Sequence, residues 1–140
     1  MKINREDFTD EFIRLAIAQG ETFDDTGAGK NTDEYLAIKK LNAKLASKLD
    51  KLVDFLADDP VFAKEMIDKL IASTNFYVII ATAGLLWEFN YCMKDCYRLF
   101  EKVISDKDEK HGLSVIAAKN FYLAIKEGRL KRRKEYPKLD

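Results

Sequence analysis

The stretch Ile67–Phe89, IDKLIASTNFYVIIATAGLLWEF, decides the fold that this sequence predicts. It predicts the end of one helix, a tight polar turn, and a second helix with small residues at its centre. Asn75 suits the start of the second helix, because its side chain can accept a hydrogen bond from a free N–H of the first turn. Ala81, Ala83 and Gly84 then allow a neighbouring helix to approach closely. This pattern is typical of stacked helical hairpins.

The rest of the chain predicts a wholly helical fold. Two prolines and six glycines among 140 residues leave few interruptions, so long helices are favoured over strands and turns. Apolar residues recur at intervals of three and four, as on one face of a helix. The six helices that we expect cover about Arg5–Gly20, Thr32–Leu56, Pro60–Ala72, Asn75–Phe89, Met93–Ser105 and Leu113–Glu127.

Polar residues between these segments mark where helices begin and end. Asn4 is a candidate cap of the first helix, and Asp59 precedes a proline that suits a first helical position. Gly128 is a natural stop after the last helix. We expect Gly20–Asn31 to be a loop, or a frayed helix end followed by a loop, because two further glycines lie there in a polar cluster.

Parts of the sequence repeat. DKLI at residues 68–71 parallels EKVI at residues 101–104, an offset of 33, and the pair Val78 and Ala81 recurs at an offset of 37. These offsets lie near the periods of helical-repeat families. Stacked hairpins bury the apolar faces that single hairpins would leave exposed to water.

We therefore predict an all-α fold over residues 1–140. It is a single domain, a short α-solenoid of about six helices, with a basic tail at residues 129–140. Such a fold presents a surface and does not by itself supply a catalytic centre.

Charge divides the chain into two unlike halves. Residues 1–73 hold 11 Lys and Arg against 15 Asp and Glu, a net −4, and residues 74–140 hold 13 against 9, a net +4. The total is zero, so we do not expect a dedicated nucleic-acid binder. The N-terminus lacks a signal-peptide core, and the longest apolar run, Phe76–Trp87, is too short to span a bilayer. We expect a cytoplasmic protein that does not enter membranes.

No motif predicts catalysis, a metal site or a cofactor. Cys92 and Cys96 lie four residues apart without a C-x-x-C motif, and we expect both thiols to pack as small apolar groups. His111 has no Ser or Cys nucleophile at a recognisable spacing, so we expect a loop residue. We predict that the chain is not an enzyme.

The chain resembles a small bacterial family of HEAT-like α-α superhelix domains of unknown function. The resemblance covers about Asp10–Leu130. It rests on the helix FIRLAIAQGETF, on Asn31 with Tyr35, on the turn and helix STNFYVIIATAGLL, and on the closing helix AAKNFYLAIKEGRL. HEAT-type repeats usually place an arginine after the valine of this turn and helix, whereas this chain has isoleucine. The resemblance implies a short right-handed α-α superhelix, a HEAT-like solenoid, as the fold. It also implies a small cytoplasmic partner protein, similar to the immunity proteins that bind and neutralise bacterial toxin domains.

Two groups of residues are candidates for binding a protein partner such as a toxin domain. The acidic group would meet a basic partner surface, because complementary charge speeds association; the alternative is a solvated loop. The aromatic group would anchor an interface, and the alternative is that it packs a helix end. The candidates are Glu21, Asp24 and Asp25 in the acidic group, and Tyr77, Trp87, Asn90 and Tyr91 in the aromatic group.

Two other functions stay open at this point. The basic residues of Arg129–Lys134 favour a helical-repeat protein that binds nucleic acid, although we expect this segment to be a solvated end. The charged terminal segments resemble the polar caps of a solenoid, and an oligomeric scaffold would pair such ends. Our preferred interpretation is a protein-binding module that is a monomer before it binds.

Overall fold

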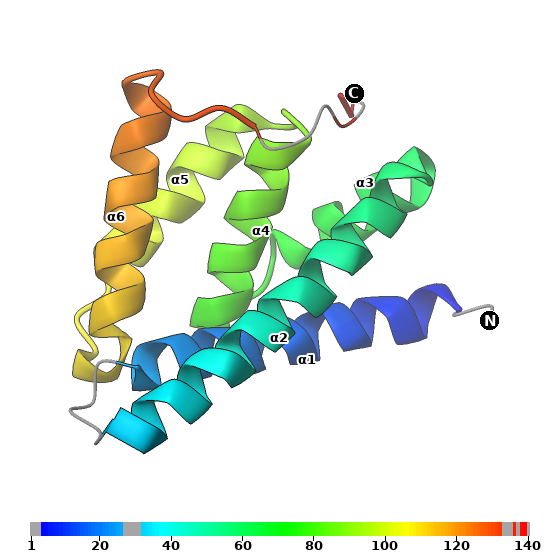
Figure 1. Cartoon of the computed structure of the whole chain (residues 1–140). Helices are drawn as coiled ribbons and strands as arrows, with labels where there is room; N and C mark the ends of the chain where they lie inside the picture. The colour runs from blue at the N-terminus through cyan, green and yellow to red at the C-terminus, as the bar shows by residue number, and fades with distance from the viewer. Residues whose placement is uncertain (1–3, 27–31, 133–135, 137, 140) are drawn as a thin grey trace.

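The computed structural model describes residues 4–26, 32–132, 136 and 138–139, and over these residues the protein is all-helical without a strand (Figure 1). This confirms the predicted all-α class. The elements are α1 (Arg5–Asp25), α2 (Thr32–Ala57), α3 (Pro60–Leu70), α4 (Phe76–Glu88), α5 (Met93–Ile104), a 3₁₀ turn η1 (Glu109–His111) and α6 (Gly112–Lys126). No described helix has the length and apolar character needed to cross a membrane.

The predicted helix ends are confirmed by their caps. The side chain of Asn4 accepts from the Asp7 amide at 2.8 Å, and Asn75 accepts from both Tyr77 and Val78 at the start of α4. These bonds satisfy amides that have no partner inside the helix. Gly128 has φ +70° just after α6, a conformation that costs glycine little.

The helices pack around α4, which lies at the centre of the molecule (Figure 1). It contacts α1, α3 and α5, while α5 also contacts α6 and α2 packs on α1 and α3. The first helix also contacts the last, since α1 packs against α6. The predicted HEAT-like superhelix is a finer statement than these contacts establish, and it stays a prediction.

The core lies between α4 and the helices that contact it. Phe12, Leu56, Met66, Leu86 and Phe89 are among its fully buried side chains. Each large apolar side chain that is fully buried contributes about 1.5–3 kcal/mol to folding. The small residues predicted to allow close packing divide between two sides of α4. Ala83 is fully buried, and its carbonyl oxygen accepts from the Cys96 thiol on α5.

The predicted end of the first helix at about Gly20 is wrong, because α1 continues to Asp25. Of the two alternatives for Gly20–Asn31, the described residues therefore favour a helix end over a loop that begins at Gly20. Gly20 lies inside this helix and is buried there against the ring of Tyr77. A Cβ atom at this position would lie 2.7 Å from Cγ and 2.9 Å from Cε1 of Tyr77. The glycine is therefore required by a close approach of α4, and it does not end the helix.

One further prediction is corrected. Cys92 is exposed, with φ +48° just before α5, so only Cys96 is the buried thiol that we expected. In the basic segment predicted to be a solvated end, the described cations Arg129, Lys131 and Arg132 are exposed. Farther along the tail, Leu139 is only 4% exposed, and its amide donates to the carbonyl of Phe89. An aliphatic side chain that reaches the core is stabilised there by the loss of its contact with water.

Substituting Gly20 with alanine should destabilise the protein by about 1–3 kcal/mol, because the new methyl group must displace the Tyr77 ring. Gly84→Ala is the matched control. Nothing lies within 4 Å of a Cβ atom there, so the better helix propensity of alanine should stabilise by up to about 1 kcal/mol. Urea unfolding followed by circular dichroism measures both. Equal effects at the two positions would contradict the packing described here.

Candidate functional site

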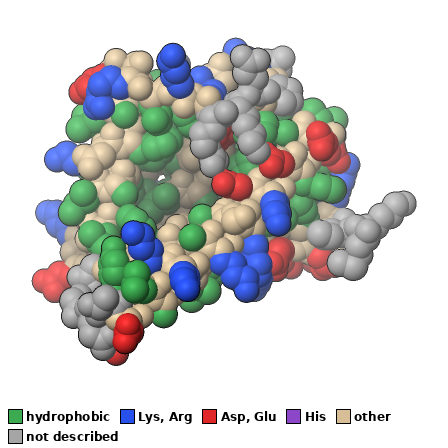
Figure 2. Space-filling model, in the orientation of Figure 1, with side chains coloured by type: hydrophobic (Ala, Val, Ile, Leu, Met, Phe, Trp, Pro, Cys, Tyr) green, Lys and Arg blue, Asp and Glu red, His purple; other side chains and the backbone are tan. Residues whose placement is uncertain are grey.

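An open apolar cleft of about 470 Å³ lies between α1, α2, α4 and α6. Figure 2 shows it as a hollow with hydrophobic side chains along its walls. The lining residues are Phe12, Ala16, Gln19, Gly20, Phe23, Leu49, Val53, Tyr77, Ile80, Ala81, Gly84, Leu85, Trp87, Glu88, Phe100, Ser114, Ala117, Ala118 and Phe121. Its volume falls in the range of about 300–1,000 Å³ that is usual for ligand sites in proteins.

The floor of the cleft is one face of α4. Ile80, Ala81 and Gly84 lie on this face, and each is only half-buried. From Phe76 to Trp87 the helix carries no charged side chain. Its only hydroxyl groups are those of Tyr77 and Thr82. A helix that is apolar on all sides is normally covered on all sides. The small residues of this face therefore leave room for a further apolar group.

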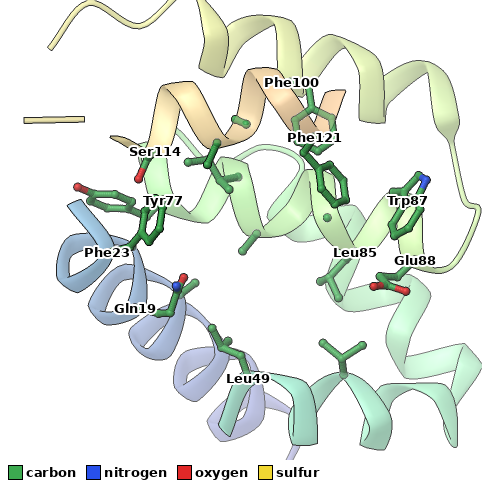
Figure 3. Close-up of a pocket in the computed structure, with 18 of the residues that line it drawn as sticks. Gln19, Phe23, Leu49, Tyr77, Leu85, Trp87, Glu88, Phe100, Ser114 and Phe121 are labelled. Atoms are coloured by element: carbon green, nitrogen blue, oxygen red, sulfur yellow. The ribbon is translucent and has the colours of Figure 1, made fainter. Parts of the chain in front are cut away.

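Aromatic rings stand at both ends of the cleft. Figure 3 shows Phe23 and Tyr77 at one end and Trp87 at the other. The Trp87 ring meets Phe121 edge to face, with ring centroids 5.1 Å apart. Glu88 lies beside Trp87, and it carries the one charge among the described residues that line the cleft.

The carboxylate of Asp24 joins three helices at the Tyr77 end. The Tyr77 hydroxyl of α4 donates to Asp24 Oδ2 at 2.6 Å, and the Ser114 amide of α6 donates to Asp24 Oδ1 at 2.8 Å. The residue before α6, His111, makes no side-chain cap bond. Asp24 thus supplies from α1 the acceptor and the negative charge that a helix N-terminus favours.

His111 lies next to this junction and is held on three sides. Its ring stacks on Phe76 with centroids 3.8 Å apart and meets the edge of Tyr77 at 5.3 Å. Its Nδ1 lies 3.0 Å from Asp106 Oδ1. The imidazole therefore packs the junction together, and His111 is not one of the residues that line the cleft.

Several tyrosines that hold helices together have raised pKa values. Burial and then the hydrogen bond to Asp24 raise the pKa of Tyr77, and burial and the bond to Asp68 raise that of Tyr91. For Tyr122, burial and the bond to Glu101 raise the pKa to about 12. Burial alone raises the pKa of the Cys96 thiol to about 12. These groups hold their protons firmly at neutral pH, so they act as donors and packing groups.

The structure brings together only part of the predicted partner-binding set. Asp24 and Tyr77 are bonded to each other, whereas Glu21 and Asp25 are exposed and lie about half a turn away from Phe23, the cleft residue of that helix end. Trp87 is only 4% exposed, with Phe121 of α6 and Arg132 of the tail against its ring.

Asn90 and Tyr91 are also engaged within the chain. Asn90 is half-buried, and its side chain accepts from Arg132 at 3.4 Å. Tyr91 is 7% exposed, and its hydroxyl donates to Asp68 at 2.9 Å. In this structure the side chains of Asn90 and Tyr91 therefore bind other parts of the same chain.

Sequence reasoning did not find the cleft or its long-range bonds. Phe23 was placed in a loop or a frayed helix end, although it continues the spacing of Phe12, Ala16 and Gly20 along one helical face. That spacing could have predicted that α1 extends past Gly20. No local signal marks Ser114, which binds Asp24 across 90 residues of chain.

The described residues contain no group of three or more His, Cys, Asp or Glu side chains that could hold a metal ion. Comparison of the chain with protein-family models, with curated proteins and with solved structures gives no match. The candidate site therefore rests on its own geometry.

Asp24→Ala should destabilise the protein by about 2–3 kcal/mol, because the Tyr77 hydroxyl and the Ser114 amide both lose a charged acceptor. The neighbouring Asp25→Ala is the matched control, since Asp25 is exposed, and it should change stability by less than about 0.5 kcal/mol. Chemical denaturation of the two variants tests this. If they lose stability equally, Asp24 does not hold the junction.

The free energy of unfolding should fall as the pH rises above 10. A tyrosine in the unfolded chain has a pKa near 10, whereas that of Tyr122 in the folded protein is about 12. Between these values the unfolded state loses its proton first, so the stabilisation present below pH 10 is progressively lost. Denaturation curves between pH 9 and about 11.5 should show a shallower decline for Tyr122→Phe. A decline equal to that of the unmodified protein would contradict this assignment.

Proposed function

We propose that this chain is a non-catalytic binding protein, and that the cleft between α1, α2, α4 and α6 receives an apolar part of its ligand. The cleft is the single observation that carries this proposal. Its floor is the face of α4 that holds Ala81 and Gly84, and no atom lies within 4 Å of the position that a Cβ atom would take at Gly84. An apolar group placed there is stabilised by the removal of both surfaces from water.

The positions of the reactive side chains support binding over catalysis. His111 is stacked and bonded beside the Asp24 junction, and the raised pKa of the Cys96 thiol makes it a poor nucleophile at neutral pH. The cleft itself is lined mainly by aliphatic and aromatic side chains, which bind but do not transfer protons.

We propose a protein as the ligand. An apolar helix face or a pair of bulky side chains from a partner would complete the burial of α4, which is apolar on nearly all sides. In its narrowest form, the partner is a toxin domain and this chain is the immunity protein that neutralises it in the cytoplasm. A HEAT-like superhelix belongs to the same proposal, as the scaffold that holds the cleft open on one side.

Filling the cleft tests the proposal. Ala81→Trp places a large ring on the floor, and it should weaken binding to the partner at least tenfold by competing for the same space. Gly84→Leu is a milder version, because the space above Gly84 is open. Titration calorimetry with the purified partner measures the effect, and circular dichroism checks that each variant is folded.

Ala43→Trp is the matched control. Ala43 is exposed on α2 and does not line the cleft, so its substitution should leave the affinity unchanged. Equal binding by the Ala81 and Ala43 variants would exclude the cleft. For the toxin-immunity form, the candidate partner is the product of the neighbouring gene, and the absence of a stable complex with it would contradict that form.

A further inference from the structure

The tail of the chain is seated on the end of α4 by side chains of three kinds. The guanidinium of Arg132 lies 5.0 Å from the centroid of the Trp87 ring, and its Nε–H donates to the Trp87 carbonyl at 2.6 Å. The hydroxyl of Tyr136 donates to Asp54 Oδ1 on α2 at 2.6 Å. Leu139 is buried against the core.

We call the receiving residues the α4-end surface, which consists of Trp87, Phe89 and Asn90 together with Asp54 of α2. Each member of it meets the tail. The Phe89 ring lies 5.1 Å from the Tyr136 ring, and the Phe89 carbonyl accepts from the Leu139 amide. Asn90 accepts from Arg132. A cation on tryptophan, a tyrosine hydroxyl on a carboxylate and a buried aliphatic group are typical anchors of a protein interface.

The α4-end surface is continuous with the cleft. Trp87 belongs to both, and Val53, which lines the cleft, precedes Asp54 on α2. Residues 129–132 leave α6 without helical structure and run toward the end of α4 (Figure 1). The described tail residues thus hold their place through side-chain contacts and the backbone bond from Leu139 to Phe89, and not through a helix or a sheet. A segment with equivalent anchors can occupy the same places.

We propose that the α4-end surface is a peptide-binding surface, filled in this structure by the chain's own tail, and that a partner protein replaces the tail with a segment of the same chemistry. The segment carries an arginine, a hydroxyl-bearing aromatic residue four positions later and an aliphatic residue three positions after that. This inference rests on the proposed function, because it names the part of a protein partner that lies next to the cleft.

A tail in the same chain competes strongly with any added peptide. Because the tail belongs to the same chain, its effective concentration at the surface is of the order of millimolar. A peptide in solution therefore binds only to the fraction of molecules in which the tail is released. Weakening the tail's own anchors should therefore strengthen peptide binding. Such an increase in peptide affinity distinguishes a shared site from non-specific attraction between a basic peptide and the protein.

The test uses a fluorescent peptide with the sequence of residues 129–140, RLKRRKEYPKLD, and the full-length protein. Fluorescence anisotropy compares the unmodified chain with the variant that carries Arg132→Ala and Tyr136→Phe. The variant should bind the peptide roughly tenfold more tightly, and the emission of Trp87, the one tryptophan in the sequence, should return toward that of the unmodified protein. Arg132→Ala alone replaces the double variant if circular dichroism shows a loss of helix.

Two controls match charge and sequence. Full-length Lys131→Ala removes one exposed cation from the tail and should bind the peptide as weakly as the unmodified protein. A peptide with alanine and phenylalanine in place of Arg132 and Tyr136 should bind none of the proteins.

Three outcomes overturn the inference. They are equal binding by the double variant and the unmodified chain, no binding to the double variant, and equal binding of the altered peptide. If sedimentation shows that the double variant dimerises, the tail of a second copy occupies the α4-end surface. That result would overturn the inference that a segment of a partner protein binds there. None of these results depends on Ala81, so the cleft proposal is tested separately.

Discussion

The hydrogen bonds to the Asp24 carboxylate are the constraint on which the rest of the structure depends. They tie the last turn of α1 to the first turns of α4 and α6, and these three helices form much of the cleft. The tie requires Gly20, because only a residue without a side chain lets the Tyr77 ring lie so close to α1. One acidic side chain and one glycine therefore fix the width of the cleft at the end where Tyr77 lies.

The same chemistry recurs at other helix contacts. Tyrosine hydroxyls donate to carboxylates at Tyr91 with Asp68 and at Tyr122 with Glu101, in each case between different elements. A charged acceptor makes such a bond stronger than one between neutral groups, and the ring adds apolar contact area. A chain with 34% charged residues can in this way use its acidic groups to hold helices together as well as to remain hydrated.

The sequence predicted the helices better than the site. Helix ends depend on local chemistry, so Asn4, Asn75 and Gly128 marked them correctly. Gly20 misled the prediction because glycine fits both a helix break and a close approach, and only the position of Tyr77, 57 residues later, distinguishes the two. Bonds across such distances leave no periodic signal. For the same reason Trp87 could be recognised as an anchor residue, but its contact with Arg132 could not be predicted.

The bond between Asp24 and Ser114 has a consequence for the order in which the molecule forms. It closes a loop of 90 residues, so the last helix receives its N-terminal acceptor from the first. During synthesis α1 is made early, and its Asp24 can bind Ser114 only after 90 further residues have been made. Contacts between distant residues form late and slow the search for the native state. The cleft is therefore completed only near the end of folding. A nascent or truncated chain that lacks α6 has α1, α2 and α4, but it lacks the helix that closes the cleft.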